Sequence, residues 1–235
     1  MGNSILVFAP HPDDDVLGCA GSICKHLRSN IPVKIVYMTN GERGVRNTAP
    51  DIAANIRKHE VIAALSHMGN VEFEFLGLKD GSVCEDETTL RKLIRTIRET
   101  RPERIYLPHE HDRHPDHQST YHIVLKAAEY ASHVDWAQYE FPYEWRTEEL
   151  WCYEIWTPIT YVDVAEDITE YIEQKAMAIR EHKSQIEKRD FAEAIMSLNR
   201  YRAVMQNVGK YCEVFKVIKA SHTSDKLVSI KPTTT

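Results

Sequence analysis

The feature of this chain that most restricts its fold is a regular alternation of short apolar runs and longer helical patterns. Strands are expected at residues 5–8, 32–38, 71–76, 104–107, 150–156, 160–164 and 212–218. Helices are expected at residues 16–28, 50–68, 87–101, 118–131, 168–187 and 191–207. Strands that alternate with helices at this spacing predict an α/β fold of the Rossmann-like, doubly wound type. We therefore expect a mostly parallel sheet with helices on both faces.

The length of 235 residues is sufficient for one substantial hydrophobic core. Hydrophobic residues make up 43% and charged residues 27% of the chain, which is typical of a soluble globular protein. No internal repeat or linker divides the sequence. We expect residues 1–220 to form a single domain and the polar residues 221–235 to form a disordered tail.

Charge and cysteine content exclude several classes of protein. The net charge of −6 argues against a nucleic-acid partner, which requires a basic surface. No apolar run reaches the length of a membrane span, and the N-terminus lacks the features of a signal peptide. The five cysteines are odd in number and form no Cys-x-x-Cys pair, so neither a disulfide framework nor a thiolate zinc site is indicated. We infer a cytoplasmic location.

The first predicted strand leads directly into the polar stretch at residues 9–15, with the sequence APHPDDD. Pro10 and Pro12 end the strand, and His11, Asp13 and Asp14 follow at its carboxyl end, where open α/β sheets bind their ligands. An imidazole and one carboxylate can ligate zinc, while a second carboxylate remains free to act as a base. The alternative is that the three acidic residues only cap the following helix.

A second polar cluster follows the strand predicted at residues 104–107. Residues 108–117 contain four histidines and two aspartates. A histidine-rich surface loop is one alternative, and a structural zinc knuckle is another, although knuckles commonly use cysteine. Both clusters leave their strands in the same sense, so a parallel sheet brings them to one edge. The sequence therefore predicts one metal site that is built from both clusters.

Other loops at the same sheet edge are expected to line the pocket. Residues 39–44 and 78–81 follow two further predicted strands. Arg57 and Asp80 are candidates for contacts with a substrate, although Arg57 can also form a surface ion pair with Glu60, one helical turn away. The aromatic segment at residues 133–149 suits a lid that stacks on a sugar, and aromatic packing is the alternative.

Taken together, these motifs resemble the LmbE/PIG-L family of zinc-dependent N-acetylglucosaminyl de-N-acetylases. The resemblance rests on HPDD at residues 11–14 and HPDH at residues 114–117, in this order. It is supported by TNGE at 39–42, RKHE at 57–60 and YEIWTP at 153–158, so that it spans most of residues 4–218. One departure is Asp15, which stands where the family commonly has glutamate.

The resemblance implies three ligands for a zinc ion: His11, Asp14 and His117. It also implies that Asp13 is the general base, that His114 is the electrophilic or acid partner, and that Asp116 orients His114 and favours its charged form. Three nitrogen and oxygen ligands leave a fourth position open for water, as in catalytic zinc sites. Another divalent metal such as Fe²⁺ is compatible with these ligands. The proton for the leaving amine would come from Asp13 or His114.

The function that the resemblance implies is removal of an N-acetyl group from a GlcNAc-type sugar conjugate, with release of acetate and a free amine. Another metal-dependent amidohydrolase or a two-metal phosphoesterase is an alternative, because His/Asp clusters also hold pairs of metal ions. A non-catalytic protein that binds sugar or metal is a further alternative. The resemblance also suggests that the chain associates with itself.

Overall fold

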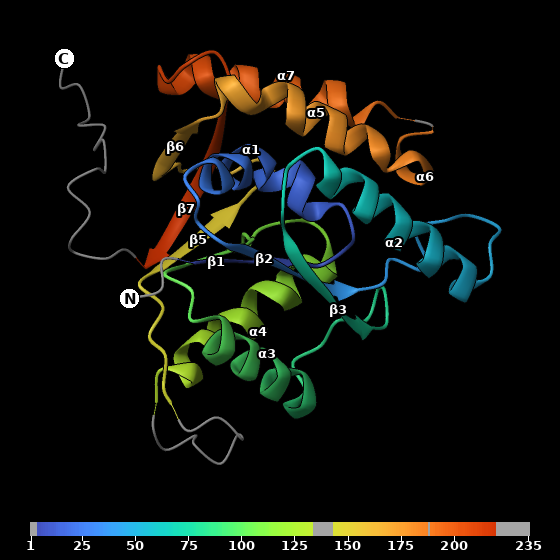
Figure 1. Cartoon of the computed structure of the whole chain (residues 1–235), viewed down its shortest axis with the longest axis vertical. Helices are drawn as coiled ribbons and strands as arrows, with labels where there is room; N and C mark the ends of the chain where they lie inside the picture. The colour runs from blue at the N-terminus through green and yellow to red at the C-terminus, as the bar shows by residue number, and fades with distance from the viewer. Residues whose placement is uncertain (1–3, 134–142, 188, 220–235) are drawn as a thin grey trace.

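The computed structural model describes residues 4–133, 143–187 and 189–219, which form a seven-stranded sheet between two layers of helices (Figure 1). The strands are β1 (Ile5–Ala9), β2 (Val33–Thr39), β3 (Glu72–Leu78), β4 (Arg104–Pro108), β5 (Glu149–Tyr153), β6 (Val164–Asp167) and β7 (Cys212–Lys219). Their order is β3-β2-β1-β4-β5-β7-β6. The first five strands are parallel, and β7 runs antiparallel to both β5 and β6. The predicted Rossmann-like α/β fold is confirmed.

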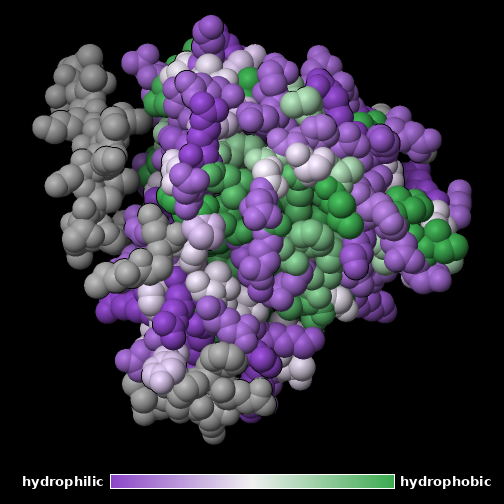
Figure 2. All heavy atoms as spheres, in the orientation of Figure 1, coloured by the Kyte–Doolittle hydropathy of each residue, from purple (hydrophilic) through white to green (hydrophobic). Residues whose placement is uncertain are grey.

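Helices cover both faces of the sheet (Figure 1). One layer contains α1 (Asp14–Arg28), α2 (Pro50–Ser66), α5 (Ile172–Glu181), α6 (Lys183–Ile186) and α7 (Phe191–Gln206), and the other contains α3 (Glu87–Thr100) and α4 (Pro115–Ala131). Figure 2 shows mainly hydrophilic residues on the outward sides of the helices and a group of hydrophobic residues in the middle of this face. Among the described helices, none is long and apolar enough to cross a membrane.

Along the buried strands, apolar side chains alternate between the two faces of the sheet, because successive residues of a strand point in opposite directions. In β1, Val7 packs into the core under α1 and α2, whereas Leu6 and Phe8 pack into the core above α3 and α4. All three side chains are fully buried. The sheet is therefore the central layer of two hydrophobic cores, which explains why β1 is apolar at every position.

The arrangement of β1 and β4 determines where the polar clusters lie. Strand β1 lies between β2 and β4. Ile5 pairs with β2 on one side and with Arg104 of β4 on the other, and Val7 pairs with Tyr106 of β4. After β1 the chain continues into β2 on one side of β1, whereas β4 lies on the other side of β1 and leads on to β5. Such a switch point opens a crevice at the carboxyl ends of the two strands. The expectation that both His/Asp clusters meet at one edge is confirmed.

Several predicted element boundaries are wrong. The predicted helix at 118–131 begins earlier, at Pro115, because proline is well suited to the first position of a helix. The predicted strand at 160–164 is replaced by β6, since Glu154 accepts the backbone N–H of Ile159 (2.6 Å) and holds this segment as a loop. The predicted helix at 168–187 is broken at His182 into α5 and α6, after a short 3₁₀ turn, η2 (Thr169–Tyr171). The predicted tail and most of the predicted aromatic lid lie outside the described residues.

Helix α1, which begins within the HPDD motif at residues 11–14, is kinked at Cys19, where φ is −143° and ψ is 20°. The Glu213 carboxylate of β7 accepts the backbone N–H groups of Gly21 (2.9 Å) and Ser22 (2.8 Å), just after the kink. Lys175 of α5 donates to the same carboxylate at 2.7 Å. Glu213 therefore caps the second part of the helix from another element, and Lys175 compensates the buried charge.

Replacing Gly18 by alanine should destabilise the protein by about 1–3 kcal/mol, the usual cost of overpacking a core. An added Cβ would lie 2.5 Å from Cδ2 of Tyr153, whose buried hydroxyl donates to the carbonyl of Phe8 at 2.7 Å. Helix propensity alone predicts the opposite sign, a gain of about 1 kcal/mol. Urea unfolding measures the difference. In a Tyr153→Ala background the substitution should instead stabilise, and an equal loss in both backgrounds would contradict the steric explanation.

Candidate active site

The three predicted metal ligands place their donor atoms in a compact triangle. Asp14 Oδ2 lies 3.0 Å from His11 Nδ1 and 3.1 Å from His117 Nε2, and the two histidine nitrogens are 3.3 Å apart. His11 lies directly after β1, Asp14 is the first residue of α1, and His117 lies in the first turn of α4. The three donors thus come from segments that the sheet itself positions.

The triangle has the size that a tetrahedral metal ion requires. Ligand bonds of about 2.0–2.1 Å place the donor atoms of a tetrahedral zinc ion about 3.4 Å apart. The second oxygen of Asp14, Oδ1, is buried and has no hydrogen-bond partner among the described residues. A donor atom of His114 also lies within 4.8 Å of donor atoms of His11 and His117. The described residues therefore fit a divalent metal ion.

The charges of the cluster also favour a cation. Burial lowers the pKa of His117, but the carboxylates of Asp14 and Asp112 outweigh this effect and raise the pKa to about 9. Burial likewise opposes protonation of His11, yet the surrounding carboxylates raise its pKa well above the ordinary value. The two histidines in turn hold the pKa of Asp14 well below its usual range, although burial acts in the opposite direction. Such a surplus of carboxylate charge is the electrostatic condition for binding a divalent metal.

Further carboxylates orient His11 and His117, the two histidines of the triangle. The Nε2 atom of His11 lies 3.1 Å from Asp116 Oδ2 and 3.4 Å from Asp80 Oδ1. The Nδ1 atom of His117 lies 3.4 Å from Asp112 Oδ1. Carboxylates on the far nitrogen of a metal-binding histidine fix its tautomer and increase its basicity. Asp112 was not among the predicted site residues, although its place inside the 108–117 cluster was a signal for it.

The structure gives Asp116 a different position from the predicted one behind His114. Its carboxylate accepts the backbone N–H groups of Gly81 (2.7 Å) and Val83 (3.1 Å) and contacts His11. Only the backbone N–H of Asp116 contacts His114, donating to Nδ1 at 3.2 Å, because His114 is the N-cap residue of α4. Since Nδ1 accepts this hydrogen bond, neutral His114 has its proton on Nε2.

His114 is also less basic than predicted. Burial lowers its pKa below the ordinary value, and the positive charges of His11 and His117 lower it further, against the opposing effect of Asp116. Asp116 does favour the charged form of His114, as predicted, but burial and the charges of His11 and His117 outweigh this effect on the pKa. The arrangement provides a neutral imidazole with an N–H donor next to the donor triangle.

Arg57, a predicted substrate contact, lines the candidate cavity and also pairs with the predicted base. Its guanidinium NH2 group lies 2.9 Å from Asp13 Oδ1, and its side chain is only 2% exposed, which rules out the alternative of a surface ion pair. Its other terminal nitrogen is 3.9 Å from Glu60, which accepts hydrogen bonds from the backbone and hydroxyl of Ser184. Burial raises the pKa of Asp13, although Arg57 lowers it. Arg57 thus orients the predicted base.

Asp80 connects two loops at the site. Its Oδ2 atom accepts the backbone N–H of Arg43 at 2.8 Å, and its own N–H donates to Glu42 Oε1 at 2.9 Å. Its Oδ1 atom faces His11, so both carboxylate oxygens are used inside the protein. Asp80, a predicted substrate contact, therefore lines the cavity and also supports His11 and the loop after β2.

The third acid of the first motif, Asp15, is fully buried in the first turn of α1. Its Oδ2 atom accepts the hydroxyl hydrogen of Tyr37 at 3.0 Å. Burial raises the pKa of Asp15 to about 7, in spite of this hydrogen bond, and the charge of Asp13 contributes to the rise. Asp15 therefore belongs to the packing beneath the site and not to the donor set.

A cavity of about 520 Å³ opens above the donor atoms. Its buried or half-buried lining includes His11, Asp13, Asp14, Arg57, Asp80, His114, Asp116, Trp156 and Gln185. Its exposed lining includes Arg43, Arg113 and Arg189. The predicted loops at 39–44 and 78–81 do line it, through Gly41, Arg43, Gly44, Asp80 and Gly81. Gly41 has φ of +62°, and a Cβ there would lie 2.9 Å from Nε of Arg57, so the turn requires glycine.

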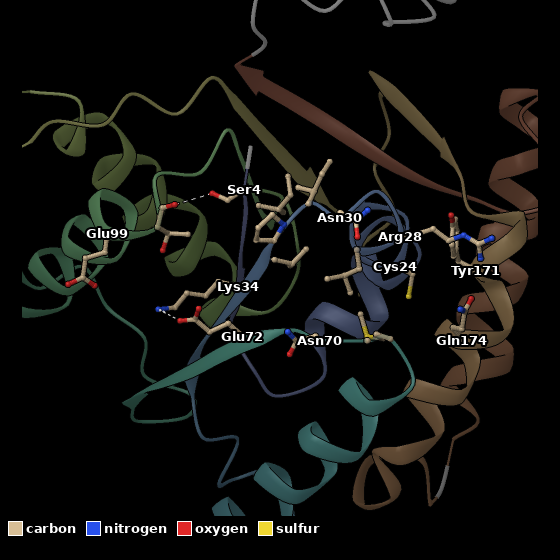
Figure 3. A pocket seen from close by; sticks show the side chains of 18 residues that line it. Ser4, Cys24, Arg28, Asn30, Lys34, Asn70, Glu72, Glu99, Tyr171 and Gln174 are labelled. Carbon is tan, nitrogen blue, oxygen red and sulfur yellow. Dashed lines mark hydrogen bonds and ion pairs between the residues drawn. The ribbon is translucent and has the colours of Figure 1, made fainter. Parts of the chain in front are cut away.

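A larger cavity of about 1150 Å³ lies at the opposite edge of the sheet, where β1 and β2 begin (Figure 3). Its labelled side chains include Lys34, which pairs with Glu72 at 3.1 Å, but no histidine or aspartate is among the described residues that line it. Its two glutamates, Glu72 and Glu99, belong to neither of the potential metal-binding groups found among the described residues, whereas both of those groups lie at the smaller cavity. The smaller cavity is the candidate active site.

Residues 6–128 match the PIG-L family, which is described as GlcNAc-PI de-N-acetylase. A Bacillus subtilis (strain 168) protein named probable N-acetyl-alpha-D-glucosaminyl L-malate deacetylase 2 is 31% identical over 196 residues, which cover 80% of this chain and 85% of that protein. The crystal structure of the conserved protein TT1542 from Thermus thermophilus is similar with a TM-score of 0.82 and 27% identity, over 99% of each chain.

The structure of GalB, the 4-carboxy-2-hydroxymuconate hydratase from Pseudomonas putida KT2440, is similar with a TM-score of 0.83 over 95% of this chain and 99% of that chain. Its identity of 23% shows a common fold alone. The match at residues 6–128 covers more than half of the sequence, and the Bacillus relative is more than 30% identical. By its sequence, its fold and its relatives, this chain belongs to the PIG-L family of de-N-acetylases.

Proposed function

We propose that this protein is a metal-dependent hydrolase that removes the acetyl group from a GlcNAc-type sugar conjugate, giving acetate and a free amine. One observation carries the proposal: the Asp13 carboxylate interacts electrostatically with His11 and Asp14 and pairs with Arg57 at 2.9 Å, but it is not one of the three donors of the triangle, so it is available as a base. Family membership and the deacetylase name of the Bacillus relative support the same reaction.

We propose Zn²⁺ as the metal, held by His11, Asp14 and His117. Two imidazole nitrogens and one carboxylate oxygen are ligands that zinc prefers, and Fe²⁺ also accepts such a set. When bound, the metal supplies Lewis acidity that polarises the amide carbonyl and acidifies the attacking water. Asp80, Asp112 and Asp116 would keep the two histidines oriented for this task.

Asp13 accepts the proton of the water as a new C–O bond forms at the acetyl carbon. Burial keeps the pKa of Asp13 raised, which makes it a better base than an exposed carboxylate, while Arg57 holds its orientation. The N–H of neutral His114 donates to the oxygen on which negative charge develops. As the C–N bond breaks, protonated Asp13 returns its proton to the amine nitrogen, and acetate leaves.

Two other reactions are compatible with parts of this arrangement. The fold occurs in a hydratase, so the fold alone does not select deacetylation. Asp80 and Asp116 also form a second possible donor set with His11 Nε2, which a two-metal phosphoesterase would need. The metal content therefore separates the hypotheses, because the deacetylase requires one equivalent and the phosphoesterase two.

The experiment is to load metal-free protein with Zn²⁺ and to measure bound metal together with acetate released from N-acetylglucosamine glycosides. We expect about one metal ion per chain. Acetate and free amine should appear in equal amounts. Two bound ions together with hydrolysis of a phosphate monoester, and no acetate, would instead support the phosphoesterase.

A further inference from the structure

A buried ion pair on α7 holds the segment at residues 154–159, which follows β5 and which we call the β5 loop. Nε of Arg202 donates to Oε1 of Glu154 at 2.9 Å, and the NH2 group of Arg202 donates to Oε2 at 2.5 Å. The same NH2 group donates to the carbonyl of Ile159 at 2.7 Å, and the backbone N–H of Ile159 donates to Glu154. The side chains of Arg202 and Glu154 are 9% and 5% exposed. The two ends of the β5 loop are therefore fixed to each other and to α7.

The β5 loop is hydrogen-bonded in turn to the second polar cluster. Asp112 Oδ2 accepts the backbone N–H of Trp156 at 3.0 Å. The hydroxyl of Thr157 accepts the backbone N–H of Arg113 at 3.0 Å, and the carbonyl of Thr157 lies 2.7 Å from Nε2 of His109. Two consecutive residues of the loop thus contact the segment that leads from β4 into α4.

Asp112 connects the β5 loop with the donor triangle. Its Oδ1 atom lies 3.4 Å from Nδ1 of His117 and accepts the backbone N–H of His114 at 2.9 Å. The Asp112 side chain is only 1% exposed, so contacts with the protein determine its orientation. A carboxylate on the far nitrogen of a metal-binding histidine orients the ring and strengthens metal binding. The orientation of His117 therefore depends on where the β5 loop places the backbone N–H of Trp156.

We propose that Arg202 and Glu154 are positioning residues for the metal centre. Their ion pair shapes the β5 loop, and the loop directs Asp112 toward His117. Neither Arg202 nor Glu154 is among the described residues that line the candidate active site, so the ion pair affects metal affinity from outside the cavity. The inference rests on the proposed function, because it concerns the metal that the donor triangle would hold. The competing explanation is that the ion pair contributes only to the stability of the fold.

The test measures the Zn²⁺ affinity of chelator-treated protein by competition with a chromophoric chelator. The variant combines Glu154→Gln with Arg202→Met, because loss of one partner alone would leave a buried charge unpaired. We expect its Kd for Zn²⁺ to rise by about 10-fold, the lower end of the effect of outer partners of metal ligands. The absorption spectrum of bound Co²⁺ should change as well, since it reports the ligand geometry.

Arg200→Met is the matched control. Arg200 is exposed on the same helix, and its guanidinium donates to the carbonyl of Lys210. This variant should keep the Kd and the Co²⁺ spectrum of the wild type. If the double variant does not fold, Glu154→Gln alone is the milder variant, because glutamine keeps the shape of the side chain, and its Kd should rise in the same direction.

An Asp112→Asn background separates positioning from a general loss of stability. In this background the double substitution should change Kd by about two-fold or less, because its effect passes through the Asp112 carboxylate. An unchanged Kd in the otherwise wild-type protein, or an equal rise in both backgrounds, would overturn the inference. Failure of the wild type itself to bind Zn²⁺ would instead count against the proposed function.

Discussion

Replacing Asp13 by asparagine should lower kcat for acetate release by about 10²–10⁴-fold, the usual contribution of a general base. Asparagine has nearly the same shape but cannot accept the proton of the attacking water. Asp13 is not part of the donor triangle, so the variant should still bind about one metal ion. The measurement combines acetate release under saturating substrate with the metal content of the same preparation.

Asp51→Asn is a suitable control, since Asp51 is exposed in the first turn of α2 and lies outside the cavity. It should retain full activity. If Asp13→Asn kept wild-type kcat with a full complement of metal, another group would have to be the base. If it lost the metal as well, Asp13 would belong to the ligand set, and its proposed separation from Asp14 would be wrong.

Much of the fold is predictable from the sequence because the elements alternate clearly and the central strands β1, β2, β4 and β5 are buried on both faces. In β1 every side chain is buried, so its apolar run has no polar interruption before Pro10. The late elements were harder to predict. The segment before β6 contains apolar residues at strand-like spacing, but a buried ion pair between Glu154 and Arg202 of α7 fixes it as a loop. Such a contact between distant elements leaves no local pattern.

The donor triangle was predictable for the same reason as the sheet. His11, Asp14 and His117 each follow directly from a strand or open a helix, so local structure carries them to one place. The partners of the remaining polar residues depend on how loops pack against one another. Asp116 reaches His11 across 105 residues of sequence, and no spacing rule indicates that contact.

Arg57 shows the same limit of sequence reasoning in a helix. Its spacing to Glu60 predicts an ion pair, and the two groups do approach within 3.9 Å. Spacing does not show that this side of α2 packs against the loop after β1. That packing buries Arg57 and gives it Asp13 as its nearer partner, at 2.9 Å. Arg57 therefore both lines the candidate cavity and pairs with the proposed base, and only the first of these positions was expected from the sequence.

Replacing His117 by alanine should abolish metal binding and reduce acetate release to background. Removing a residue that only orients a ligand lowers metal affinity by about 10–100-fold. His117 is fully buried and supplies one of the three donor atoms, so its removal should lower metal affinity by more than that. His111→Ala is a matched control, because His111 lies in the same histidine-rich segment but its side chain is 81% exposed. The control should keep both metal and activity.

Thermal unfolding gives a second measurement that does not depend on a substrate. A metal ion that binds only the folded state stabilises it, by about 2.7 kcal/mol when its concentration is 100 times Kd. Zn²⁺ should therefore raise the Tm of the wild type and of His111→Ala after treatment with a chelator, but not that of His117→Ala. Equal metal binding in both histidine variants would mean that His117 is not a metal ligand. In that case the geometry of the triangle would have no role in catalysis.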